Sequence, residues 1–80
     1  MIIEVLFFGQ ARDIAGARSL RMEIPEDTSV MTLRNLLAER FSGLDEGLQF
    51  AVAVNEVYAE NQKAIQAGDV VAVLPPVSGG

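Results

Sequence analysis

The stretch EDTSVMTLRNLLAERFSG (residues 26–43) contains the clearest helical pattern in the sequence. Apolar residues recur in it at helical spacing and form one stripe, made of Val30, Leu33, Leu36, Leu37 and Phe41. Thr28 or Ser29 can accept hydrogen bonds from the first-turn N–H groups, and Gly43 can end the helix. The sequence therefore predicts one amphipathic helix between the two halves of the chain.

Two strands are predicted before this helix. IIEVLFF (Ile2–Phe8) is apolar on both faces, which favours a central strand. SLRMEIP (residues 19–25) alternates between apolar and polar residues and stops at a proline, as a half-buried strand does. Strands this close in sequence favour an antiparallel pair. The connection GQARDIAG (residues 9–16) predicts one helical turn over Arg12–Ala15.

Further strands are predicted after the helix. FAVAV (Phe50–Val54) is followed by a tight turn at Asn55–Glu56, weaker than Asn-Gly, that leads into Val57 and Tyr58. A turn at residues 67–69 precedes Val70–Leu74, which is apolar on both faces and is expected beside the first strand. The simplest solution is an α+β fold in which a single mixed sheet wraps over one main helix. Residues 1–80 then form a single domain, with a flexible C-terminal tail at residues 75–80.

Composition restricts the function. The 80 residues have a net charge of −5, which disfavours nucleic acid and favours a partner with a basic groove. Cysteine and histidine are absent, so thiol nucleophiles, the usual zinc sites and the best neutral-pH proton carrier are missing. The apolar runs are too short to span a membrane, and the N-terminal stretch has no basic region or cleavage site. We expect a cytoplasmic protein that has no metal site and is not an enzyme on its own.

The chemistry of the chain is expected in its last residues, PPVSGG (residues 75–80). The two prolines hold the backbone extended, so six residues reach about 20 Å, far enough to enter a pocket of another protein. Gly79 and Gly80 have no Cβ, which lets the walls of a narrow tunnel close around the backbone. A terminal carboxylate with a pKa of about 3.5 is ionised at neutral pH and is a poor acyl donor, so another enzyme must activate it.

Three segments carry a resemblance that covers the whole chain. They are the opening VLFFGQARDIAG, the middle AVAVNEVY and the closing AGDVVAVLPPVSGG. Together they resemble the small subunits of molybdopterin synthase, which are ubiquitin-like sulfur carriers of the MoaD/ThiS family. A Gly-Gly end alone is shared with ubiquitin and with the thiamine-pathway carrier; the prolines and the FFGQAR opening favour the molybdopterin branch. The resemblance implies a β-grasp fold.

The resemblance also implies a mechanism and partners. An E1-like adenylyltransferase would use ATP to adenylate Gly80, and a sulfur donor would convert the adenylate to a thiocarboxylate. The tail, comprising Pro75, Pro76, Val77, Ser78, Gly79 and Gly80, would then enter the active site of the large synthase subunit. There it would donate sulfur to cyclic pyranopterin monophosphate, in a heterotetramer of two small and two large subunits. No bound cofactor is implied for the small subunit itself.

Two further residues are candidates for the partner interface. Leu74 adjoins the tail, and the resemblance implies that it docks against both the large subunit and the activating enzyme. Arg12 fits either an interface salt bridge or a solvated arginine. On the same side of the sheet we expect Phe8 and Val70 to be covered by the rest of the chain. The alternatives are a sulfur carrier for thiamine or tRNA thiolation, a ubiquitin-like protein modifier, and an interaction module with an inert tail.

Overall fold

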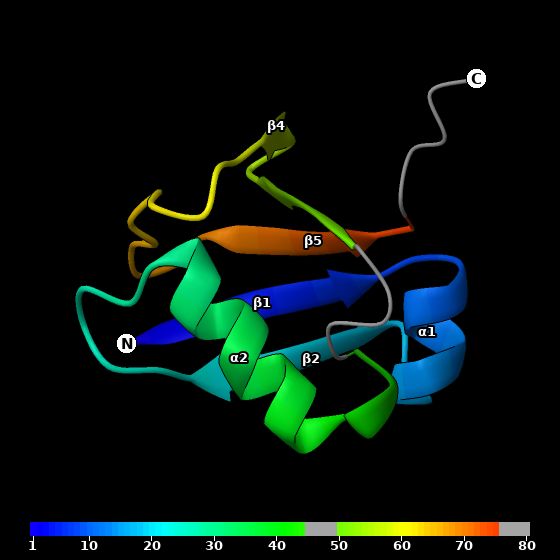
Figure 1. Cartoon of the computed structure of the whole chain (residues 1–80). Coiled ribbons are helices and arrows are strands. Elements are labelled where there is room, and N and C mark those ends of the chain that lie inside the picture. Colours follow the sequence, from blue (N-terminus) through cyan, green and yellow to red (C-terminus); the bar gives the residue numbers. More distant parts are fainter. Residues whose placement is uncertain (45–49, 76–80) are drawn as a thin grey trace.

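The computed structural model describes residues 1–44 and 50–75. Its strands form one mixed sheet in the order β2-β1-β5-β3-β4 (Figure 1). Their bounds are β1 Ile2–Phe7, β2 Ser19–Glu23, β3 Ala51–Val54, β4 Val57–Tyr58 and β5 Val70–Leu74. The predicted N-terminal hairpin is confirmed, because β1 and β2 pair antiparallel. The central position of β5 is confirmed too, since it runs parallel to β1 and antiparallel to β3.

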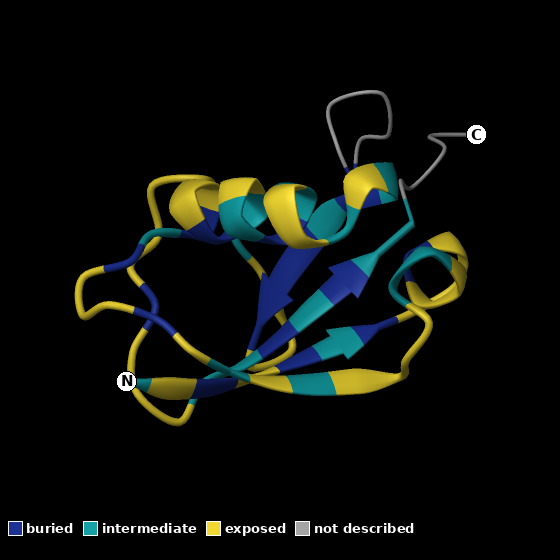
Figure 2. Ribbon diagram, turned by 90° about the horizontal axis from the view of Figure 1, so that it is seen from below, coloured by how far each residue is buried: buried dark blue, intermediate teal, exposed yellow. Residues whose placement is uncertain are grey.

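Two α-helices and a short 3-10 helix complete the fold: α1 Gln10–Ala15, α2 Val30–Arg40 and η1 Ser42–Leu44. The main helix, α2, lies across one face of the sheet, and α1 stands at one end of it (Figures 1 and 2). The connection after β1 is thus a longer helix than the single turn that the sequence predicts. In the part of the chain that the structure describes, no helix combines the length and apolarity that crossing a membrane requires.

The N-terminus of α2 begins as the sequence predicts, whereas its C-terminus lies at a different residue from the predicted one. Ser29 is the N-cap, and its hydroxyl accepts a hydrogen bond of 3.2 Å from the Thr32 N–H. Thr28 is instead buried and donates its hydroxyl proton to the Pro25 carbonyl. The helix ends at Arg40 with Phe41 in an extended conformation, so Gly43 does not terminate it. Gly43 lies within η1, where its role is one of packing.

The core lies between α2 and the inner face of the sheet. Every second residue of the central strands points into it, as their alternation predicts. The buried cluster contains Ile3, Val5, Phe7, Ala11, Ile24, Val30, Leu33, Leu37, Leu44, Phe50, Val52, Val54, Ile65, Val71 and Val73. Phe7 and Phe41 meet edge to face, with ring centroids 5.6 Å apart. The core therefore contains residues of β1 near the N-terminus, of β5 near the C-terminus, and of α2, which packs on both strands.

The β3–β4 connection is the tight turn that the sequence predicts. Asn55 and Glu56 both have positive φ, 50° and 71°, which is the pattern of a type I′ hairpin turn. The Asn55 side chain holds this turn to the start of β5: its oxygen accepts from the Val70 N–H at 3.0 Å, and its amide donates to Asp69 at 3.0 Å. The Asp69 carboxylate also accepts from the Gln66 N–H at 2.8 Å. Asp69 therefore shapes the turn into β5.

Candidate functional site

The end of β5 is the candidate site, because the predicted C-terminal tail follows it in the chain. β5 lies between β1 and β3, and its last residues pair with Phe7 and Ala51. The chain therefore leaves from the middle of one sheet end, beside α1 (Figure 1). Since strands on both sides hold Val73, and β3 also holds Leu74, the position from which the tail starts is set by the sheet.

Pro75, the first predicted tail residue, packs against the backbone of Gly9. A Cβ added to Gly9 would lie 2.5 Å from Cγ of the Pro75 ring. Gly9 has φ 56° and ψ −130°, a conformation that residues with a side chain rarely adopt. The adjacent Phe8 N–H donates to the Val73 carbonyl at 3.1 Å. Sequence reasoning used Gly9 only as a loop boundary; a glycine directly after a strand was the available signal.

The remaining tail residues of the prediction lie outside the described residues. These are Pro76, Val77, Ser78, Gly79 and Gly80. Their assignment therefore rests on sequence, and the structure supplies the point from which they start. Leu74 and Pro75, which precede these residues, are half-buried and adjoin the outer face of the sheet.

The outer face of the sheet, opposite α2, is apolar near the tail. Register places Leu6 beside Ala72 and Ala51 beside Leu74 on this face. Leu6, Ala72 and Leu74 are half-buried, and no described helix covers them (Figure 2). Phe8 is 44% exposed, so the prediction that the rest of the chain covers it is wrong, whereas Val70 is half-buried. An open apolar surface beside the tail is suited to a protein partner.

Arg12 lies on α1, at the same end of the sheet as the exit of the tail (Figure 1). It is exposed, and its backbone takes part in the local bonds of α1, donating to Gly9 and accepting from Gly16. Its position is compatible with the predicted interface role.

A different arginine, Arg34 on α2, has its pKa lowered by desolvation, but it lies on the helix that covers the opposite face.

Comparison with known proteins identifies the family. The model of the ThiS family matches residues 5–80. The chain is 35% identical over 82 residues to a protein from Homo sapiens named molybdopterin synthase sulfur carrier subunit, covering 98% of this chain and 93% of that protein. The family match begins within β1 and includes the other strands, α2 and the C-terminal segment.

Solved structures agree with this result. A putative molybdopterin converting factor subunit 1 from Pyrococcus furiosus superposes with a TM-score of 0.86 at 29% identity, covering 96% of this chain and 99% of that one. A complex of subunits 1 and 2 of molybdopterin-converting factor from Helicobacter pylori contains a chain that matches at a TM-score of 0.68 and 31% identity, with both chains fully covered (100%). The small archaeal modifier protein 1 of Haloferax volcanii matches at 0.83 and 25% identity, over 95% of this chain and 98% of that one.

The fold is thus the ubiquitin-like β-grasp that the resemblance implies. The family match runs to residue 80 and so includes the Gly-Gly end. The chain therefore belongs to the ThiS family, together with the proteins named molybdopterin synthase sulfur carrier subunit.

Proposed function

We propose that this chain is the sulfur carrier subunit of molybdopterin synthase and that Gly80 is its reactive residue. The observation that carries the proposal is the match over the full chain to a relative named as that subunit. The sheet supports it, because two neighbouring strands hold β5 and present the tail from a fixed place. An acidic chain without cysteine or histidine suits a protein that is itself a reactant while its partners supply catalysis.

The chemistry takes place at the terminal carboxylate. An E1-like enzyme uses ATP to form a mixed anhydride between Gly80 and AMP, with release of pyrophosphate. A sulfur donor then displaces AMP and leaves a thiocarboxylate. The loaded tail donates this sulfur to cyclic pyranopterin monophosphate in the large subunit. This chain contributes its tail, Pro75–Gly80, and the glycines leave room for the partner's walls to approach the backbone.

Docking to the large subunit uses the outer sheet face beside the tail. Leu74 is half-buried at the end of β5, next to exposed Phe8. Burial of this surface in a complex removes apolar area from water at roughly 25 cal/mol per Å². Arg12 lies at the same end of the molecule and is suited to the polar rim. The Helicobacter pylori structure contains subunits 1 and 2 together, which supports a two-subunit assembly; we propose two copies of each, in the cytoplasm.

The intact mass of the protein tests the carrier chemistry. The chain is incubated with ATP, a sulfur source and the host's activating enzyme, and a variant lacking Gly80 is the matched control. We expect a gain equal to replacement of one oxygen by sulfur, mapped to Gly80, in the full chain only. An unchanged mass, with the enzyme active on another carrier, would refute the proposal. Transfer to the large synthase subunit then separates the molybdopterin pathway from thiamine or tRNA thiolation.

A protein modifier is the second candidate, favoured by the likeness to the small archaeal modifier protein 1. In that role the activated Gly80 would be joined to lysines of other proteins. Immunoblots of host cells distinguish the two functions: a ladder of higher-mass conjugates that disappears when Gly80 is deleted supports the modifier. A single band of unconjugated protein contradicts it.

A further inference from the structure

The structure assigns a second reactive position to this chain: we propose that the ε-amine of Lys63 is the acceptor for the activated Gly80 of a second copy. The inference rests on the proposed function, because it requires Gly80 in an activated form. The observations that carry it are the amines of the chain, the hollow into which Lys63 points, and the position of this hollow relative to the tail.

The sequence supplies very few nucleophilic amines. Its six basic residues comprise one lysine, Lys63, and five arginines. A guanidinium stays protonated at neutral pH, whereas a lysine amine can act as a nucleophile. The α-amine of Met1 donates a hydrogen bond of 2.7 Å to the Ile24 carbonyl and is partly buried. Lys63 is exposed and is therefore the accessible acceptor.

The backbone at Lys63 is held firmly. Its carbonyl accepts from the Val30 N–H at 2.9 Å, which joins it to the first turn of α2. Its own N–H donates to the Glu60 carbonyl at 3.0 Å. Two residues on, Ile65 is buried at 2% exposure and donates to the Thr28 carbonyl at 2.9 Å. The side chain thus starts from a fixed point, which reduces the entropy lost when its amine is positioned.

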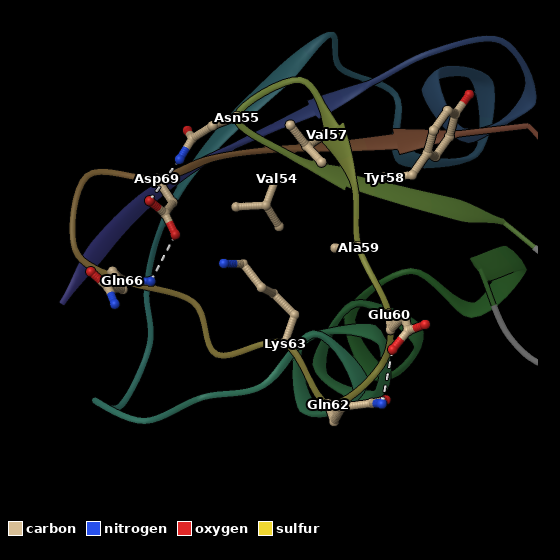
Figure 3. Close-up of a pocket in the computed structure, with 10 residues that line it drawn as sticks. All are labelled: Val54, Asn55, Val57, Tyr58, Ala59, Glu60, Gln62, Lys63, Gln66 and Asp69. Atoms are coloured by element: carbon tan, nitrogen blue, oxygen red, sulfur yellow. Dashed lines mark hydrogen bonds between the residues drawn. The ribbon is translucent and has the colours of Figure 1, made fainter.

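Lys63 points into a hollow of about 660 Å³ between β4 and the segment that precedes β5 (Figure 3). Val54, Val57 and Ala59 give this hollow an apolar wall. The carboxylate oxygens of Asp69 accept from Asn55 and from the Gln66 N–H, and Glu60 accepts from Gln62. None of these hydrogen bonds among the described residues involves the Lys63 amine. Because Glu60 and Asp69 disfavour an anionic ligand, the hollow suits a neutral acyl group that follows an apolar side chain.

The end of this chain has that chemistry. Its sequence after Pro75 is PVSGG, in which an apolar Val77 precedes a terminal carboxylate by three residues. Five extended residues reach about 16 Å, enough to cross the hollow. Val77 can pack on the exposed Val57, which brings the acyl carbon of activated Gly80 within reach of the Lys63 amine. The apolar residue of the tail thus has an apolar partner in the hollow, and the activated acyl group has a nucleophile.

The arrangement favours a second copy over the chain's own tail. Gln66 and Asp69 in the hollow precede β5, whereas the tail follows the opposite end of that strand. A strand of this length separates its two ends by about 13 Å, so the chain's own Gly80 could reach Lys63 only if the residues after Pro75 turned back along the sheet. An intermolecular bond therefore requires no reversal of the tail.

The bond-forming step is balanced. The neutral amine nitrogen attacks the carbonyl carbon of the Gly80 acyl-adenylate, and an amide C–N bond forms. The C–O bond to the phosphate breaks, AMP leaves with its electron pair, and the amine proton passes to water. The product is an isopeptide-linked dimer. Lys63 would thus let activated carrier be consumed as covalent oligomers, since AMP has left and the amide is no longer an activated form.

The test uses the chain with a preformed thioester at Gly80, which bypasses the activating enzyme. Mass spectrometry of the products should show a dimer linked between Gly80 and Lys63. Lys63→Arg keeps the charge and should lose this dimer completely, while its Gly80 is still converted to thiocarboxylate by the activating enzyme. The matched control is Arg18→Lys in the Lys63→Arg background, because Arg18 is also exposed. It should form less dimer than the unchanged chain if the hollow guides the reaction.

Three results would overturn the inference: no dimer from the thioester, a link to Met1 or to the same chain, or equal dimer from the Arg18→Lys control. In each case formation of the thiocarboxylate on the unchanged chain would leave the proposed function standing. Failure of that sulfur transfer, with dimer still formed from the thioester, would refute the proposed function and support the acceptor site.

Discussion

Gly43 should be intolerant of a side chain, although its position near the end of α2 suggests an ordinary helix stop. A Cβ built on it lies 2.7 Å from Cγ2 of Ile14, and 3.2 and 3.3 Å from its Cγ1 and Cδ1. Ile14 belongs to α1, so Gly43 is a point of close contact between η1 and α1. Gly43→Ala therefore forces Ile14 or the η1 backbone to move.

The expected cost follows from two opposing effects. Overpacking of this kind costs about 1–3 kcal/mol. Replacing glycine by alanine recovers about 0.4–1 kcal/mol from the unfolded chain. The two effects together give a net loss of about 0–2.5 kcal/mol, and for a domain of this size each kcal/mol lowers the midpoint of thermal unfolding by about 4–8 °C. Thermal and urea unfolding followed by far-UV circular dichroism measure this change.

A double-mutant cycle isolates the contact. Ile14→Ala removes all three atoms that the new Cβ would meet, so Gly43→Ala in that background should be neutral or slightly stabilising. The coupling energy is then about 1–3 kcal/mol, the overpacking term alone. If Gly43→Ala costs the same in both backgrounds, the contact with Ile14 is not the cause, and the reasoning from geometry fails.

Four further predictions concern the tail, the interface and the β3–β4 turn. Deleting Gly79–Gly80, or adding a residue after Gly80, should abolish sulfur transfer without changing the unfolding midpoint, because the core cluster is complete at Val73; normal transfer would contradict the carrier role. Gly80→Ala should slow adenylation if a narrow tunnel surrounds the tail, and equal rates would refute that steric argument. Leu74→Ser should weaken binding to the large subunit by about 1–2 kcal/mol in calorimetry, and unchanged affinity would remove it from the interface. Glu56→Gly should raise the free energy of unfolding by about 0.5–1 kcal/mol, because φ of 71° strains a residue with a side chain; lower stability would show that the turn does not store this strain.

Local rules explain what could be predicted from sequence. The apolar stripe of α2 and its Ser29 cap, the alternation of β2, and the two-faced apolar strands β1 and β5 each depend on residues a few positions apart. Such patterns report which side of an element is buried and where it begins. The Gly-Gly end also stands out in sequence, because its proposed role depends on the absence of side chains. These signals were enough to predict one mixed sheet over one helix and a candidate reactive residue.

The tertiary structure alone decided the features that join distant parts of the chain. Gly9 meets Pro75 across 66 positions, and Gly43 meets Ile14 across 29. The exposure of Phe8, which was predicted to be covered, depends on what packs around it and not on its own neighbours in sequence. The hollow at Lys63 exists because Ile65 holds one segment to the residues before α2 and the Asn55–Asp69 hydrogen bond holds it to the β3–β4 turn. Periodicity and capping are read within a few residues, whereas close packing is set by which surfaces the folded chain brings together.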